Sequence, residues 1–176
     1  ANERMRAGVS AEWRQDENVD TGDERRTWLL RSSARYNASE ELTLQGKFNL
    51  AQSNQTRADD TLGPVSFNNA EFTEGSIAAA YRPIWDDRCN LLGKIVWLDD
   101  LAPTSQCFGG QTLDYRQKST SVSVDTAYDV SPKWTLGGKY AYRAGEVTSS
   151  RDSLDFTRSE AELGVLRLDY HATLQW

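Results

Sequence analysis

The sequence predicts an all-β fold, an antiparallel up-and-down β-barrel of eight strands. Two observations predict it. Apolar and polar residues alternate over stretches such as Trp28–Tyr36, and a period of two residues is typical of a strand with one shielded face. The alternating stretches are separated by turns, and a unit of two strands recurs about every 45 residues. Such a repeat of hairpins without helices favours a closed or stacked β-sheet.

Eight alternating stretches can be followed along the chain, and each has one apolar and one polar face. We expect strands at 4–14, 26–36, 42–52, 71–82, 90–97, 119–128, 134–143 and 160–175. In the third stretch, for example, Leu44 and Phe48 alternate with Gln45 and Lys47. Since no linker or low-complexity segment interrupts the pattern, residues 1–176 are expected to form a single domain.

The expected connections are short at one end of the strands and long at the other. The short turns are Asn37–Glu40, Pro83–Asp87 and Asp129–Lys133. The long, mostly polar loops are Ser53–Asn69, Asp99–Gln111 and Gly145–Thr157. Glycine and proline in the first two long segments support this interpretation, because both residues punctuate regular structure.

Composition excludes some classes of protein. No run of eighteen apolar residues exists, which excludes a transmembrane helix, and the net charge is −6. A mean hydropathy of −0.67 does not exclude a membrane barrel, because only alternate residues of its strands need be apolar. The chain opens with Ala1-Asn2-Glu3, which is compatible with a mature chain after signal cleavage or with a shortened one.

Three features favour a barrel in a membrane over a soluble, lipocalin-like, ligand-binding barrel. The apolar face is almost free of charge for about ten residues per strand, the length that spans a bilayer when tilted. The connections are asymmetric, with short periplasmic turns and long extracellular loops expected. Aromatic residues gather at strand ends, as in membrane-interface girdles. The girdle residues are Trp13, Trp28, Trp97 and Tyr142 at one end, and Tyr36, Tyr81, Tyr128, Trp134 and Tyr170 at the other.

Over its whole length the chain resembles the small bacterial outer-membrane β-barrels of the OmpA and OmpX type. Apolar residues alternate from Leu168 through Tyr170 to the terminal Trp176, which is similar to the signal by which the barrel-assembly machinery recognises such proteins. The resemblance implies residence in the outer membrane as a monomer, contact with its lipids and lipopolysaccharide, and no nucleic acid partner. A competing interpretation notes that Thr173–Trp176 resembles Ser131–Trp134, where a strand begins. Trp176 would then open a ninth strand, and the chain would be a piece of a larger barrel.

The polar face supplies the residues expected to line the lumen. They are Arg6, Glu12, Arg14, Arg31, Arg35, Lys47, Glu74, Lys94, Asp125, Lys139, Arg143, Arg167 and Asp169. Eight strands leave little more room than side chains fill, so a packed, salt-bridged interior is one expectation. Since bases outnumber acids and buried charges need partners, the other is a lumen that holds water and anions. We therefore expect a non-enzymatic barrel that serves as an anchor, small pore or model barrel, with an anion or small-solute pore as the alternative.

No catalytic, cofactor-binding or metal-binding residues are predicted. The single histidine, His171, is expected at the short-turn end and has no serine or cysteine at a recognisable spacing. Cys89 and Cys107 are expected at opposite ends of one strand, too far apart for a disulfide bond. Two unpaired thiols, or introduced labelling sites, remain the favoured interpretation.

Overall fold

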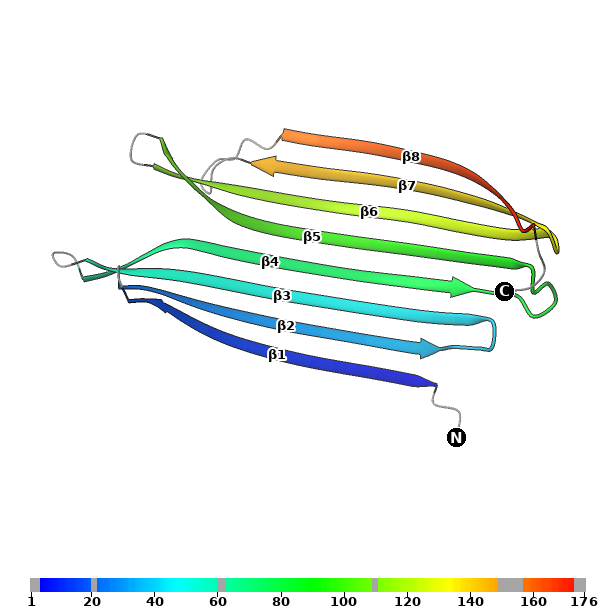
Figure 1. Ribbon diagram of the computed structural model, residues 1–176, viewed down its shortest axis with the longest axis horizontal. Coiled ribbons are helices and arrows are strands. Elements are labelled where there is room, and N and C mark those ends of the chain that lie inside the picture. Colours follow the sequence, from blue (N-terminus) through cyan, green and yellow to red (C-terminus); the bar gives the residue numbers. More distant parts are fainter. Residues whose placement is uncertain (1–3, 20–21, 60–62, 109–110, 149–156, 173–176) are drawn as a thin grey trace.

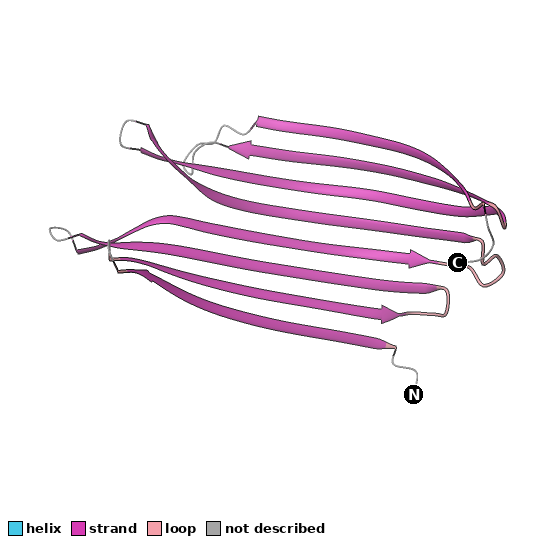
Figure 2. Cartoon of the chain, viewed as in Figure 1, coloured by secondary structure: helices cyan, strands magenta, loops and turns pink. Residues whose placement is uncertain are grey.

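The computed structural model describes residues 4–19, 22–59, 63–108, 111–148 and 157–172. They form eight strands and, in the part described, no helix (Figures 1 and 2). The strands are β1 (Met5–Asn18), β2 (Asp23–Asn37), β3 (Leu42–Asp59), β4 (Gly63–Tyr81), β5 (Cys89–Phe108), β6 (Gln111–Ser131), β7 (Trp134–Thr148) and β8 (Thr157–Tyr170). Each strand pairs antiparallel with its neighbours in the chain, in one sheet of order β1 to β8. The prediction of eight antiparallel up-and-down strands is confirmed.

The sheet is curved, and closure into a barrel is not seen. Among the described residues no pairing joins β1 to β8. The curvature is seen in a cavity of about 620 Å³ whose lining spans β3 to β8 and includes Thr43, Asp125, Lys139 and Arg167. Strands five places apart in a sheet can line one cavity only if the sheet bends between them. All four of these residues occupy polar positions, so the polar face is concave there.

The expected long loops are wrong in two of three cases. β3 and β4 continue their ladder from Ser53 to the pair Asp59↔Gly63, and β5 and β6 continue theirs to Phe108↔Gln111. In Figure 1 the β3–β4 hairpin reaches furthest to the left, and the β5–β6 hairpin extends beyond β7 and β8. Only the third segment, Gly145–Thr157, contains a longer connection, residues 149–156, which lie outside the described residues. The alternation of apolar and polar residues ends before the strands do. Hydrogen bonds between backbones form whatever the side chains are, so pairing can continue beyond the alternating residues.

Both extensions contain a site of irregular pairing. The register of β3 with β4 shifts between Ser53 and Gln55, and that of β5 with β6 shifts between Pro103 and Cys107. A proline lacks the N–H that a regular ladder needs, so its place beside a bulge is the one a sheet tolerates. The proline that suggested a loop in the sequence therefore marks a bulge inside a strand.

The sheet is staggered in the same way at each of the three short turns. Tyr36 of β2 pairs with Leu44, Tyr81 of β4 pairs with Leu91, and Tyr128 of β6 pairs with Leu136. In each case the partner is the third residue of the next strand. As a result, a row of paired residues that starts at the first residue of β1 reaches β8 six residues before its end. That row is Met5, Tyr36, Leu44, Ala79, Gly93, Val124, Tyr140 and Gly164. Such shear is what tilts the strands of a barrel.

Hydrogen bonds between neighbouring segments hold the short-turn end together. The short turn predicted after β2 is confirmed at residues 38–41. The Glu41 carboxylate in this turn accepts a hydrogen bond from the backbone N–H of Ile84 at 2.8 Å. In the turn after β4, residues 82–88, Arg88 donates to Asp86 at 3.0 Å, and its guanidinium lies 5.4 Å from the centre of the Tyr128 ring. That hydrogen bond holds the pKa of Asp86 below its usual range. The turn after β6 is shorter than expected, since β6 continues to Ser131.

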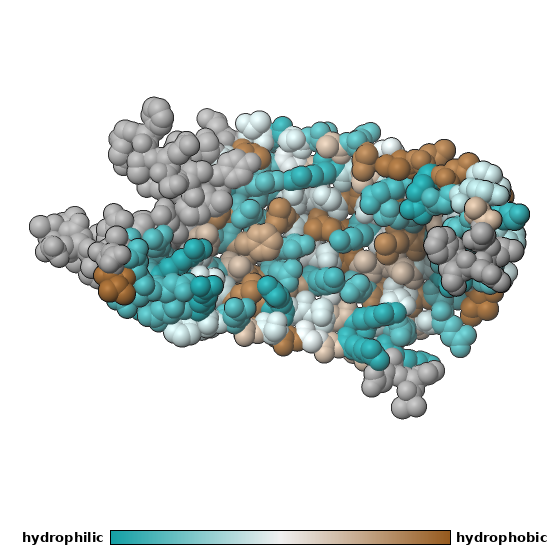
Figure 3. Space-filling view, in the orientation of Figure 1, coloured by the Kyte–Doolittle hydropathy of each residue, from teal (hydrophilic) through white to brown (hydrophobic). Residues whose placement is uncertain are grey.

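The sheet has almost no apolar core of its own. Leu101 is the only buried hydrophobic residue among those described, whereas Val9, Trp28, Ile77 and Leu168 are each more than half exposed. A soluble monomer rarely leaves so much apolar surface open to water. In the space-filling view, hydrophilic, intermediate and some hydrophobic residues are mixed across the middle of the visible face, and hydrophobic residues are more frequent toward the short-turn end on the right (Figure 3).

Candidate lumen face and lipid-facing belt

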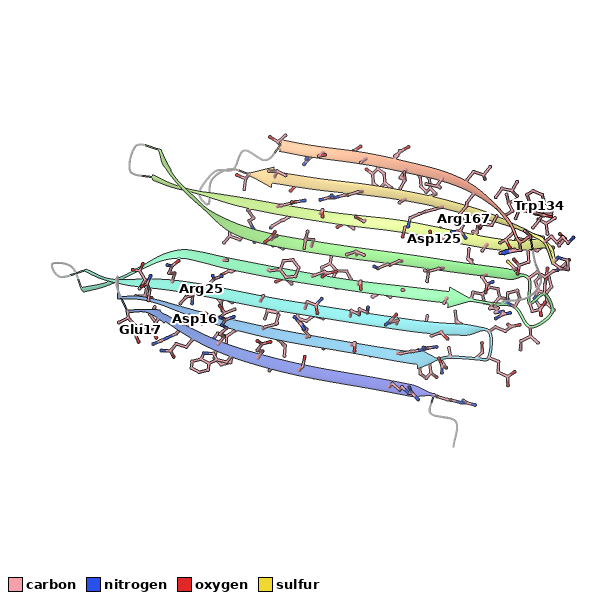
Figure 4. All side chains as sticks on the ribbon, viewed as in Figure 1. Asp16, Glu17, Arg25, Asp125, Trp134 and Arg167 are labelled. Atoms are coloured by element: carbon pink, nitrogen blue, oxygen red, sulfur yellow. The ribbon has the colours of Figure 1, made fainter. Side chains whose placement is uncertain are left out.

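The pairing register divides the sheet into two faces of opposite chemistry. The apolar face holds the row from Met5 to Gly164 and every second residue along each strand from it. The polar face holds the residues between them. All thirteen charged residues that the sequence suggested for a lumen lie on the polar face, nine of them basic and four acidic. Two of them, Asp125 and Arg167, are labelled in Figure 4.

Most aromatic residues of the apolar face form two lines that follow the stagger, and Phe48 and Tyr140 lie between them. Tyr36, Tyr81, Tyr128 and Tyr170 lie at or within three residues of the short-turn ends of β2, β4, β6 and β8. Trp134 joins this line and packs on Tyr170, with ring centroids 4.7 Å apart.

The second aromatic line lies higher up the strands. Trp28 is eight residues from Tyr36 and stands beside Trp13, with ring centroids 6.4 Å apart. Trp97 pairs with Gly75, six residues from Tyr81, and Tyr142 pairs with Val122, six residues from Tyr128. The two predicted sets of aromatic residues therefore lie at two heights on one face.

The apolar face carries no charge between these two lines. Counted from the tyrosine of each strand, the first charged residue on this face is Arg26 in β2, Glu71 in β4 and Lys118 in β6, each ten residues away. In β8 it is Glu162, eight residues from Tyr170. Nine residues of a strand tilted by about 40° rise roughly 23 Å, close to the height of the apolar band of an outer-membrane barrel. We call this charge-free surface the belt.

Charged residues pair with one another directly above the belt. The Arg116 guanidinium donates two hydrogen bonds to the Asp99 carboxylate, at 2.8 and 3.0 Å, and the Lys118 ammonium lies 3.8 Å from it. On the next hairpin Arg158 lies 3.4 Å from Glu146. The apolar face thus changes from hydrocarbon to ion pairs within one or two residues, as expected where a lipid core meets headgroups and water.

On the polar face, one basic residue per hairpin lies at the same height. Lys47 pairs with Ser76, Lys94 with Ser123 and Lys139 with Val165, and each partner is five residues from the tyrosine of its strand. Arg31 is itself five residues from Tyr36. We call Arg31, Lys47, Lys94 and Lys139 the basic row. It crosses the polar face behind the middle of the belt.

Most of the basic row lacks an acidic partner. Lys139 lies 3.3 Å from Asp125, but Arg31, Lys47 and Lys94 form no ion pair with any described residue. Arg31 and Lys47 line a hollow of about 390 Å³ together with Ser10 and Asn49. Of the acids nearby, Glu74 accepts a hydrogen bond from Asn49 at 3.2 Å, and Asp169 lies 2.8 Å from Arg167. Unpaired cations at this depth require water or anions beside them.

Sequence reasoning assigned these residues to one face but missed that they form a row. A signal was available, because Lys47 and Lys94 are 47 residues apart and Lys94 and Lys139 are 45 apart, close to the hairpin repeat. The register was needed to turn that spacing into equal height, since a bulge or a different stagger would have displaced one lysine from the next.

The single histidine and the two cysteines lie at or near the ends of strands. His171 lies at the short-turn end, where its backbone N–H donates to Lys133 and its ring lies 3.4 Å from the Thr135 hydroxyl. Cys89 is the first residue of β5 and forms no disulfide bond, and Cys107 is near the other end of the same strand. Within the described ranges no group of three potential ligands could hold a metal ion. The terminal residues 173–176, and with them Leu174 and Trp176, lie outside the described part.

A scan of protein-family models finds no match to this chain, and a search of curated proteins finds none either. Among the described residues, no helix is long and apolar enough to cross a membrane.

Proposed function

We propose that this chain forms the wall of a non-enzymatic β-barrel in a bacterial outer membrane. Its apolar face contacts lipid, and its polar face lines the lumen. The end opposite the short turns, with its ion pairs, faces the lipopolysaccharide leaflet, and the short-turn end faces the periplasm. The barrel-assembly machinery would insert it, as it does the outer-membrane barrels that the sequence resembles.

One observation carries this proposal: the belt. One aromatic line near the short turns and a second line six to eight residues above it lie on a charge-free band of bilayer thickness on one face of the sheet, while charges fill the other face. A soluble barrel of the lipocalin kind would need the reverse, with its apolar face turned inward. Here the polar face is the concave one, because it lines the cavity between β3 and β8.

A pore for anions or small anionic solutes is favoured over a passive anchor by the basic row. Rings of arginine and lysine select for anions in pores. Bases outnumber acids by nine to four among the thirteen residues suggested for a lumen, although Arg25, Asp16, Asp23, Asp100 and Asp129 lie on the same face nearer its ends. The excess is therefore greatest at the basic row, where Arg31, Lys47 and Lys94 have no acidic partner among the described residues. A lumen packed shut would have to bury these cations without compensation, which costs several kcal/mol per ion, of order 5.

Refolding from urea tests the membrane assignment. In the presence of detergent micelles or phospholipid vesicles, we expect a folded β-protein that migrates differently on gels before and after boiling. Without lipid or detergent, we expect aggregation, because the belt would be left open to water. A folded, monodisperse protein in plain buffer would overturn the proposal.

A further inference from the structure

We propose that β8 of one copy pairs with β1 of a second copy, and the reverse, so that two chains close one sixteen-strand barrel. This inference rests on the proposed function, because it concerns a sheet placed in lipid. β1 and β8 are the two edges of the sheet, and neither has a partner on its outer side among the described residues. In hydrocarbon an unpaired edge leaves a row of backbone N–H and C=O groups without hydrogen bonds, so a membrane sheet must close.

The stagger of the sheet fixes the register of the missing junction. Each of the tyrosines Tyr36, Tyr81 and Tyr128 pairs with the third residue of the next strand. Tyr170 holds the same place in β8, and the third residue of β1 is Ala7. The same rule therefore sets Ala7 opposite Tyr170. Antiparallel pairing from that point sets Ala11 opposite Leu166 and Trp13 opposite Gly164, with the apolar residues of both strands on the same face.

A second, independent feature selects the same register. Within the sheet, Gly75 lies six residues before Tyr81, and its partner Trp97 is the ninth residue of β5. The Trp97 ring covers this glycine so closely that a Cβ atom placed on Gly75 would lie 1.9 Å from it. Only glycine fits beneath a ring in that position.

The two edge strands carry the same pair of residues, a glycine on β8 and a tryptophan on β1, but the two are not in contact. Gly164 lies six residues before Tyr170, and Trp13 is the ninth residue of β1. A Cβ atom on Gly164 would meet nothing within 4 Å, so its site is open. Trp13 leans on Trp28 and is 53% exposed. The junction would bring the Trp13 ring over Gly164, as Trp97 lies over Gly75.

Among the described residues, two observations favour a second copy over closure within one chain: the separation of the two edge strands and the unpaired charges of the basic row. The two edges of a single chain make no contact with each other in the described residues, whereas all other neighbouring strands do. Eight strands enclose a lumen that side chains fill, and sixteen leave an aqueous channel. Because Arg31, Lys47 and Lys94 lack acidic partners there, the wider barrel is the one that leaves them in water. Two copies joined in this way are related by a twofold axis along the pore, and both edges are satisfied.

Cysteine crosslinking between differently tagged chains tests the junction. In a background with Cys89→Ser and Cys107→Ser, an Ala11→Cys chain and a Leu166→Cys chain are mixed in urea, refolded together into vesicles and oxidised. Directly opposed residues of antiparallel strands have Cα atoms about 5 Å apart, within disulfide range. We expect a crosslinked dimer that carries both tags. The matched control, Ala7→Cys with Leu166→Cys, places the thiols about 13 Å apart along the strands and should give at least about tenfold less product.

Each outcome of this experiment decides the inference. A crosslink that forms within single chains carrying both Ala11→Cys and Leu166→Cys, but not between chains, would show an eight-strand barrel and overturn the second copy. Folded, heat-modifiable protein with neither crosslink would mean that other strands cover the edges, which also overturns it. If the protein fails to enter vesicles at all, the proposed function itself fails, so the two failures are distinguishable.

The glycine provides a second test. Gly93 also has open space above it, but it lies inside the sheet between Ala79 and Val124. We expect Gly164→Val to lower the crosslinked dimer at least about threefold and Gly93→Val to leave it unchanged, because only the former fills the place of a ring. In a Gly164→Val chain that also carries Trp13→Ala, crosslinking should recover. Equal effects of the two glycine substitutions would contradict the register.

Discussion

Neighbouring residues of each strand lie on opposite faces of this sheet, and the two faces differ in the side chains they carry. Between the aromatic lines the apolar face holds no charge, whereas the polar face behind it holds the basic row and its few acids. Both faces are exposed to similar degrees, as Val124 at 41% and the Lys139 side chain at 43% illustrate. Burial against protein therefore does not distinguish the two faces, and the proposed function attributes their difference to lipid on one side and water on the other.

The largest effect is expected from placing a charge on either side of one strand. Phe48→Arg, within the belt, should destabilise the membrane-folded state by about 2–4 kcal/mol, the cost of arginine near the bilayer midplane. Asn49→Arg, on the polar face between Arg31 and Glu74, should cost far less. Urea unfolding in vesicles measures both, and Phe48→Gln separates the loss of the ring from the added charge. Similar losses for both arginine variants would mean that the faces are not distinct.

The basic row should set the charge preference of the lumen. In planar bilayers under a chloride gradient, we expect a reversal potential that favours anions, because three cations without an acidic partner among the described residues would line the proposed pore. The variant Lys47→Gln/Lys94→Gln should lower that preference, and Arg88→Gln, in the turn after β4, should not change it. Cation selectivity in the unsubstituted protein would mean that the polar face does not line the conducting path.

A smaller effect is expected at the edge of the belt. Trp134 packs on Tyr170 in the lower aromatic line, whereas Trp85 lies in a turn and is 79% exposed. Trp134→Ala should lower the free energy of unfolding by about 1 kcal/mol beyond the loss of buried area, the usual worth of such a ring pair. Trp85→Ala serves as the control for removal of an indole outside the belt. An equal loss at both positions would argue against a defined girdle.

The smallest effect of a substitution is expected in the turn after β4, which belongs to neither face of the sheet. The Arg88 side chain donates to Asp86, so the pKa of Asp86 is lowered. The pKa of Asp86 is lower in the folded than in the unfolded protein. The contact with Arg88 therefore stabilises the turn at pH values above the ordinary aspartate pKa, and this stabilisation is lost as the pH falls through the lowered pKa. NMR titration of the Asp86 carboxyl group in micelles should give a value below the usual aspartate range, which Arg88→Gln restores. An unchanged value in that variant would contradict the hydrogen bond.

Sequence alternation was enough to predict the eight strands and the face of the thirteen charged residues assigned to the polar side. The pattern of Leu44 and Phe48 against Gln45 and Lys47 carries both kinds of information, because neighbouring side chains of a strand point to opposite faces. Strand ends were not predictable in this way. Beyond Gln52 the residues of β3 are almost all polar, and beyond Asp99 the few apolar residues of β5, such as Leu101 and Phe108, do not alternate with polar ones. The alternation therefore disappears while backbone pairing goes on.

The stagger was equally hidden from the sequence. That Tyr36 pairs with Leu44 and not with Leu42 depends on how the turn at residues 38–41 closes, through hydrogen bonds that a hydropathy pattern does not encode. Without the stagger, neither the common height of Lys47, Lys94 and Lys139 nor the match between Gly164 and Trp13 can be derived.

Nitroxide scanning of β6 in vesicles tests the central claim most directly. A spin label is placed at each position from 120 to 128 in turn, and its collisions with oxygen, which concentrates in lipid, and with a water-soluble nickel chelate are measured. The two-faced sheet predicts a strict alternation, with lipid exposure at Val122, Val124 and Thr126 and water exposure at Ser121, Ser123 and Asp125. No alternation, or alternation with the opposite phase, would contradict the assignment of the belt to lipid and of the basic row to the lumen.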